Sequence, residues 1–100
     1  MINFIEYNNL GSLSDEAPVS VDSAAAIAYT ITAGKKGVSF QNVGSKVVWY
    51  GGINVNPATS RGHKLVPMQV LSYRNTKNTF KIYFKCESGD TSTIGVINYS

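Results

Sequence analysis

The stretch VSFQNVGSKVVWYGG, residues 38–52, decides the fold class. Its first residues alternate apolar and polar side chains, as along a strand that buries one face. Residues 46–50 are rich in β-branched and aromatic side chains, which favours a second strand. Gly44 and the serine after it predict a tight hairpin between the two strands. At Gly51 and Gly52, which end the second strand, we expect positive φ angles and close approach of a neighbouring backbone.

The same pattern continues on both sides of this stretch. Runs that favour strands are separated by turn residues about every 8 to 12 residues, which predicts an all-β fold. We expect a small antiparallel β-sandwich or barrel of jelly-roll type, with residues 53–64 as a polar loop. Alternation along the strands gives the expected inward-facing positions, which are Ile27, Tyr29, Ile31, Val38, Phe40, Val47, Trp49, Leu65, Leu71, Phe80, Ile82, Phe84, Ile94 and Val96.

Two residues raise separate questions about burial. Pleating places Trp49 and Tyr50 on opposite faces of their strand, and the sequence leaves open which of the two is buried. Cys86 ends the apolar stretch 80–86 and is the chain's one cysteine. It cannot form an internal disulfide, so we expect a reduced core residue in a chain made in a reducing cytoplasm.

Length and composition indicate one domain preceded by an extended arm. The chain has 100 residues, of which 43% are hydrophobic and 15% charged, as in a single globular domain. We place the arm at residues 1–16 and the β-sandwich domain at residues 17–100. Asn and Gly residues interrupt any helical period in the arm. Its apolar anchors are expected to bind a partner surface, or else to cover the domain's own sheet edge: Phe4, Ile5, Tyr7, Leu10 and Leu13.

Charge is divided unevenly along the chain. Residues 1–22 contain four acids and no base, which gives −4, whereas residues 23–100 contain nine bases and two acids, which gives +7. An acidic segment on a basic body can dock on that body or on a neighbour, although the same charges also suit a plain solvated surface. No apolar run approaches the about 18 to 20 residues that span a bilayer, and no signal-peptide pattern is present.

The titratable residues offer no catalytic or metal-binding set. His63, the one histidine, lies in the sequence RGHK, residues 61–64, with no carboxylate or cysteine near it in sequence. No phosphate-binding, dinucleotide-binding or EF-hand pattern occurs. We therefore expect no enzyme activity, no metal and no cofactor. Arg61 and His63, together with Gly51 and Gly52, are instead predicted to be turn and loop contacts to a partner.

Two other binding functions fit parts of the sequence. Nine basic residues accompany Tyr50, Tyr73 and Tyr83, a combination found in OB-like domains that bind single-stranded nucleic acid. The basic residues are, however, spread over loops and strands rather than gathered on one strand pair. A carbohydrate- or receptor-binding module is the other alternative, because Trp49 and two of the tyrosines could stack on sugar rings.

The order of the motifs resembles small β-rich virion proteins of tailed bacteriophages. Residues 38–52 are followed by a polar loop, Gly62, the tripeptide Leu65-Val66-Pro67 and two closing strands, and the resemblance covers residues 19–99. The basic RGHK loop and the longer tip at residues 74–78 depart from this pattern.

The resemblance implies a structural protein of the virion, made in the host cytoplasm, with no membrane association. It implies a head decoration, auxiliary capsid or head-fibre component, with a tail or neck component as the alternative. The implied partners are the major capsid protein or other virion proteins, and further copies of the chain in a homo-oligomer. Nucleic acid is a less favoured partner.

Overall fold

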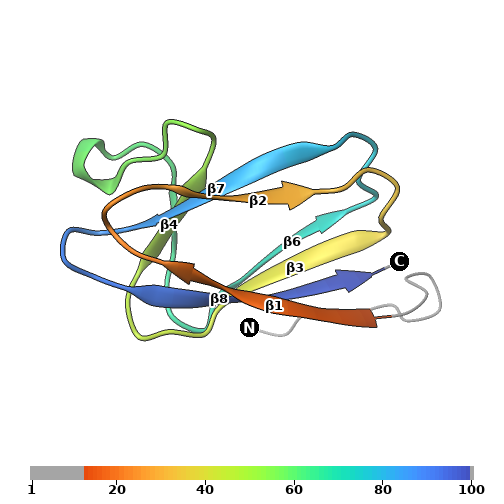
Figure 1. The fold of residues 1–100 in the computed structure, drawn as a ribbon, viewed down its shortest axis with the longest axis horizontal. Helices are drawn as coiled ribbons and strands as arrows, with labels where there is room; N and C mark the ends of the chain where they lie inside the picture. Colours follow the sequence, from red (N-terminus) through yellow and green to blue (C-terminus); the bar gives the residue numbers. More distant parts are fainter. Residues whose placement is uncertain (1–12, 100) are drawn as a thin grey trace.

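The computed structural model describes residues 13–99 of the chain. Those residues form eight strands and one short 3-10 helix, η1 (Figure 1). The elements in order are β1 (Leu13–Val21), β2 (Ile27–Ile31), β3 (Gly37–Asn42), β4 (Val48–Gly51), η1 (Pro57–Thr59), β5 (His63–Leu65), β6 (Val70–Arg74), β7 (Phe80–Cys86) and β8 (Ser92–Tyr99).

The strands form two four-stranded antiparallel sheets with a jelly-roll order. One sheet has the order β1-β8-β3-β6 and the other β2-β7-β4-β5. The pairs β1–β8, β2–β7, β3–β6 and β4–β5 are those of one long hairpin wound around itself, and the pairs β8–β3 and β7–β4 complete the sheets. Figure 1 shows β2 and β7 along one side of the molecule and β1 and β8 along the other. The predicted β-sandwich is thus confirmed.

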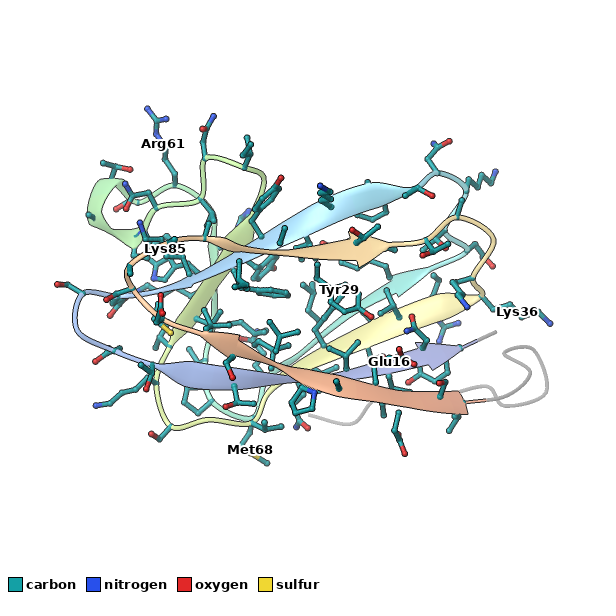
Figure 2. The ribbon with its side chains drawn as sticks, viewed as in Figure 1. Glu16, Tyr29, Lys36, Arg61, Met68 and Lys85 are labelled. Atoms are coloured by element: carbon teal, nitrogen blue, oxygen red, sulfur yellow. The ribbon has the colours of Figure 1, made fainter. Side chains whose placement is uncertain are left out.

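The core lies between the two sheets and is centred on aromatic rings. The Phe40 ring centroid lies 5.4 Å from that of Phe84 and 5.2 Å from that of Tyr29, which points between the sheets (Figure 2). Eight of the expected inward-facing residues are buried in this core, and Tyr29 and Leu71 are half-buried against them. The eight are Ile31, Val38, Phe40, Leu65, Ile82, Phe84, Ile94 and Val96. Burial on this scale makes the inter-sheet core the main source of stability.

Four of the expected inward-facing residues are not part of this core. Ile27 and Phe80 are 42% and 39% exposed, and each is the first residue of its strand. The Phe80 ring still contacts the Tyr73 ring of the opposite sheet, with the ring centroids 5.6 Å apart. Val47 is half-buried and precedes β4. Trp49 is buried, but on the outer face of its sheet, since Val48 and Tyr50 are the β4 residues that pack into the core.

The connection between β3 and β4 differs from the predicted hairpin. The two strands lie in different sheets, so residues 43–47 cross from one layer to the other. Asn42 organises this crossing from a fully buried position. Its Nδ2 donates to the carbonyl oxygens of Lys46 (2.7 Å) and Leu65 (2.8 Å), while its Oδ1 accepts from the Gly44 amide (3.1 Å) and the Ser92 hydroxyl (2.7 Å). Every polar atom of this side chain is therefore satisfied by protein.

Two predicted boundaries fall inside strands. β1 begins at Leu13 and pairs with β8, so residues 13–16 of the predicted arm belong to the sheet. The predicted polar loop, residues 53–64, contains η1 and the start of β5. β5 was not predicted because its three residues, His63 to Leu65, are too few to show an alternating pattern.

Candidate docking groove

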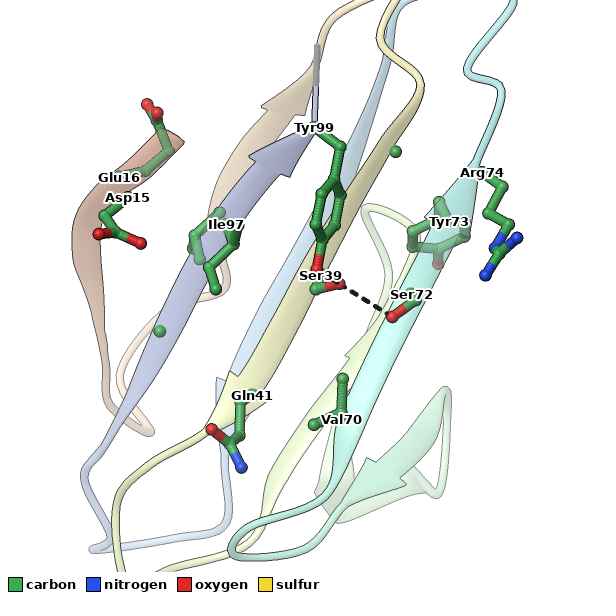
Figure 3. Close-up of a pocket in the computed structure, with 13 residues that line it drawn as sticks. Asp15, Glu16, Ser39, Gln41, Val70, Ser72, Tyr73, Arg74, Ile97 and Tyr99 are labelled. Carbon is green, nitrogen blue, oxygen red and sulfur yellow. Dashed lines mark hydrogen bonds between the residues drawn. The ribbon is translucent and has the colours of Figure 1, made fainter. Parts of the chain in front are cut away.

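A groove of about 460 Å³ lies on the outer face of the β1-β8-β3-β6 sheet (Figure 3). All four strands of the sheet contribute to it, so the groove crosses the sheet rather than following one strand edge. Its lining residues are Asp15, Glu16, Gly37, Ser39, Gln41, Val70, Ser72, Tyr73, Arg74, Gly95, Val96, Ile97 and Tyr99. More of this lining is apolar than polar. Such a surface favours a ligand that buries hydrocarbon and makes a few hydrogen bonds.

The floor of the groove is shaped by the register of three strands. Ser39 of β3 lies directly between Ile97 of β8 and Ser72 of β6. Its hydroxyl lies 3.0 Å from that of Ser72 and 3.1 Å from that of Tyr99, within hydrogen-bonding distance of both. A side chain at Gly37 would come within 3.1 Å of the Tyr99 ring, so the missing side chain lets that ring lie close to β3.

The two rims of the groove carry opposite charge. Asp15 and Glu16 of β1 stand on one side and Arg74 of β6 on the other (Figure 3). Tyr73 contributes to the same wall as Arg74 but packs its ring inward. Burial, and secondly Tyr50, raise the pKa of the Tyr73 phenol above its ordinary value of 10.0, so it stays neutral at physiological pH. Because the β1 rim is acidic and the β6 rim carries Arg74, a ligand with an acidic group would bind with that group toward the β6 rim.

The outer face of the β2-β7-β4-β5 sheet is basic. Lys64, Trp49 and Lys85 lie side by side on β5, β4 and β7. The Lys64 Nζ lies 5.7 Å from the centroid of the Trp49 ring, and the Trp49 Nε1 donates to Glu87 at 2.9 Å. Trp49 is only 8% exposed, so it presents little ring surface on which a sugar could stack.

Of the four predicted loop contacts, Arg61 lines a cavity. This second cavity, of about 470 Å³, lies against the loop after β4 and is lined by Ala26, Ile53, Asn54, Val55, Asn56, Thr59, Arg61 and Lys85. Figure 2 shows Arg61 and Lys85 in the same region of the molecule. His63 is exposed elsewhere, with its ring 5.9 Å from that of Tyr50. The structure thus brings Arg61 together with Lys85 and not with His63.

The expected positive φ angles at Gly51 and Gly52 are not found. In this loop they occur instead at Ser60 (57°) and Gly62 (111°). A Cβ atom on Gly62 would lie 2.7 Å from both the Tyr50 carbonyl oxygen and the Val55 side chain. Gly62 is therefore the glycine that the loop requires, because it alone combines a positive φ with close approach of another backbone segment.

Most of the predicted arm anchors lie outside the described residues. This applies to Phe4, Ile5, Tyr7 and Leu10, whereas Leu13 begins β1 and is 44% exposed. Leu13 pairs with Tyr99, so the arm joins the sheet at the end where Tyr99 enters the groove. The groove itself was missed by sequence reasoning. The polar residues that alternate with Val38 and Phe40 indicated an outer face, but nothing in their spacing indicated a concave one.

Cys86 is a free, buried thiol, as expected. Burial is the main cause that raises the pKa of the Cys86 thiol above its ordinary value of 9.0, and Asp90, Asp22 and Glu87 add to the shift. Within residues 13–99, no cluster of three or more His, Cys, Asp or Glu side chains could hold a metal ion. The same residues include no helix with the length and apolar character needed to cross a membrane.

The strand order and the groove together define a jelly-roll β-sandwich with one concave sheet face. Comparisons with protein-family models, with curated proteins and with solved structures found no match to this chain.

Proposed function

We propose that this chain is a non-enzymatic structural protein of a tailed-bacteriophage virion. Its place would be in the head, as a decoration, auxiliary capsid or head-fibre component, and its arm would dock on neighbouring virion proteins such as the major capsid protein. The observation that carries the proposal is the groove, which opens where the arm joins β1 at Leu13. The jelly roll also occurs among viral capsid domains, and that support is by analogy of fold.

The chemistry of the groove suits binding better than catalysis. Its Ser39 hydroxyl lies next to the hydroxyls of Ser72 and Tyr99, and none of these is a general base that would activate it. The sandwich then acts as a rigid block. Burial of Phe4, Ile5 or Tyr7 on a neighbour would contribute about 1.5 to 3 kcal/mol each, and repetition of the contact over many copies would multiply a modest single affinity.

The test is incorporation into virions. Mass spectrometry of purified virions is expected to detect the full chain. The triple variant Phe4→Ala, Ile5→Ala, Tyr7→Ala is expected to keep the native far-ultraviolet circular dichroism spectrum yet be lost from virions, whereas Asn3→Ala is incorporated normally. Absence of the native chain from virions would contradict the function, and normal incorporation of the triple variant would contradict the anchoring role. Cryo-electron microscopy of labelled virions then separates a head from a tail or neck position.

A second candidate function is binding of single-stranded nucleic acid. Lys81, Tyr83 and Lys85 alternate along the outer face of β7, with Lys64 nearby, which gives one stacking ring flanked by cations. Tyr50 and Tyr73 pack toward the core and do not add to this platform.

Fluorescence anisotropy with labelled oligothymidylate separates the two candidates. The virion protein is expected to bind weakly, with a steep salt dependence, through its basic residues alone. Binding that persists at about 0.3 M salt, is lost in Tyr83→Ala and is retained in Tyr83→Phe would favour the nucleic-acid function instead.

A further inference from the structure

The same sequence contains a segment whose chemistry suits the groove on the β1-β8-β3-β6 sheet. We propose that it binds residues 2–7 of its own chain, folded back over the sheet from the start of β1. The inference deepens the proposed function, on which its role in assembly rests, because it names the surface that holds the docking arm before a neighbour takes it.

The described chain enters the sheet at Leu13, beside one end of the groove. Leu13 pairs with Tyr99, Tyr99 pairs with Gly37, and Gly37 pairs with Arg74. These four residues form one row across one end of the sheet, and three of them line the groove. The chain that precedes Leu13 is therefore attached to the sheet in the row of residues that lies at one end of the groove.

Residues 2–7 have the length to cross the groove, and the residues that follow them favour a turn. Four strands span about 14 Å at the usual spacing of about 4.8 Å, and six extended residues cover about 20 Å. Residues 2–7 can therefore cross the whole groove. Between them and β1 lie Asn8, Asn9, Gly11 and Ser12, which are residues that favour chain reversal. The tether thus has both the length and the composition to return the segment to the sheet.

The side chains of residues 2–7 complement those that line the groove. The segment INFIEY, residues 2–7, contains four large apolar side chains and one charged side chain, Glu6. The groove offers the half-buried side chains of Val70 and Ile97 as apolar contacts. The rim charges favour one placement, in which Glu6 faces Arg74 on β6 and lies away from the carboxylates on β1.

The segment in the groove is expected to come from the same chain and not from another copy, because it is covalently attached to β1. A short tether holds its end at an effective concentration on the order of millimolar, which exceeds that of a free neighbour in dilute solution. The chain's own segment therefore occupies the groove in the free subunit. Docking on a virion neighbour then requires that residues 2–7 leave the groove, so apolar anchors are shielded until the local concentration of partner surface is high.

Disulfide trapping in the full-length protein tests the inference. The pair Ile5→Cys with Ser72→Cys places one thiol in the segment and one in the groove, and the control pair Ile5→Cys with Thr30→Cys places the second thiol on the exposed outer face of the other sheet. The native Cys86 is buried, so it is kept in both double variants. Under mild oxidation, the groove pair is expected to form an intramolecular disulfide at least about tenfold faster than the control pair, because only the groove holds the segment nearby.

Two results would overturn the inference: equal rates for the two pairs, or disulfides that join two chains and form faster as the protein is concentrated. Charge reversal adds an independent readout. Glu6→Arg and Arg74→Glu are each expected to slow trapping in the groove pair, and the two together to restore it. If neither single change alters the rate, the proposed placement of Glu6 is wrong. Trapping is measured on the isolated protein, so it can succeed or fail independently of detection in virions.

Discussion

Replacement of Asn42 is expected to be among the most destabilising single changes in this domain. The side chain is fully buried, and it makes four hydrogen bonds that join the end of β3 to the β3–β4 crossing, to Leu65 and to Ser92. Two of these bonds, to Leu65 and Ser92, are themselves buried. A buried polar group left without a partner costs about 1 to 3 kcal/mol. Asn42→Ala orphans two such groups and opens a small cavity, which gives a loss of about 3 to 5 kcal/mol.

Urea unfolding followed by far-ultraviolet circular dichroism measures this loss. The expected loss is a large share of the about 5 to 15 kcal/mol that stabilises a typical domain, so the midpoint should fall strongly while the slope m stays constant. The matched control is Gln41→Ala on the preceding residue, whose amide donates one exposed hydrogen bond to the Met68 carbonyl at 3.0 Å. It is expected to cost about 1 kcal/mol or less. If the two variants unfold at the same urea concentration, the network does not hold the layers together as argued.

Two further predictions concern the loop after β4 and alkaline pH. Gly62→Ala is expected to cost about 2 kcal/mol or more in the same assay, because its φ angle is positive and a Cβ atom would clash with the backbone. Gly52→Ala is the control: a Cβ atom there has nothing within 4 Å, so its urea midpoint should stay close to that of the native protein. Equal midpoints for the two variants would contradict this prediction. Folding raises the pKa values of Cys86 and Tyr73, so both groups bind protons more tightly in the folded state. Their contribution to the free energy of unfolding is fully present below their ordinary pKa values of 9.0 and 10.0. It is lost as pH rises above those values and through the raised pKa values of the folded state. Thermal melting between neutral pH and about pH 11 should show this decline, and a Cys86→Ala variant should decline less steeply; parallel curves would refute the assignment to the thiol.

The strands and most of the core could be predicted because alternation is a local signal. Val38 and Phe40, or Ile82 and Phe84, bury alternate positions whichever strand lies opposite. The partner of each strand is not a local property. Gly44 follows a strand as a hairpin glycine would, yet the chain there crosses to the other sheet, because the Asn42 side chain takes hydrogen bonds that a hairpin partner would supply.

The groove could not be predicted for the same reason. Ser39 and Ser72 lie far apart in sequence and meet only through the pairing of β3 with β6. Trp49 was assigned inward by strand alternation, but it lies on the outer face, where the Lys64 Nζ lies 5.7 Å from the centroid of its ring. In the loop after β4, the residue that needs a positive φ, Gly62, is set by the approach of Val55 and not by the Gly51-Gly52 pair.

The position of β8 has a consequence for how the domain is made. This strand comes last among the eight and yet lies in the interior of its sheet, between β1 and β3. While the chain is still being synthesised, β1 has no neighbour and β3 has one open edge. Neither can be protected early by local pairing, since Leu13 must wait for Tyr99. Folding is therefore expected to be slow for a domain of this size, and the unfinished chain to be prone to edge-to-edge association until β8 has left the ribosome.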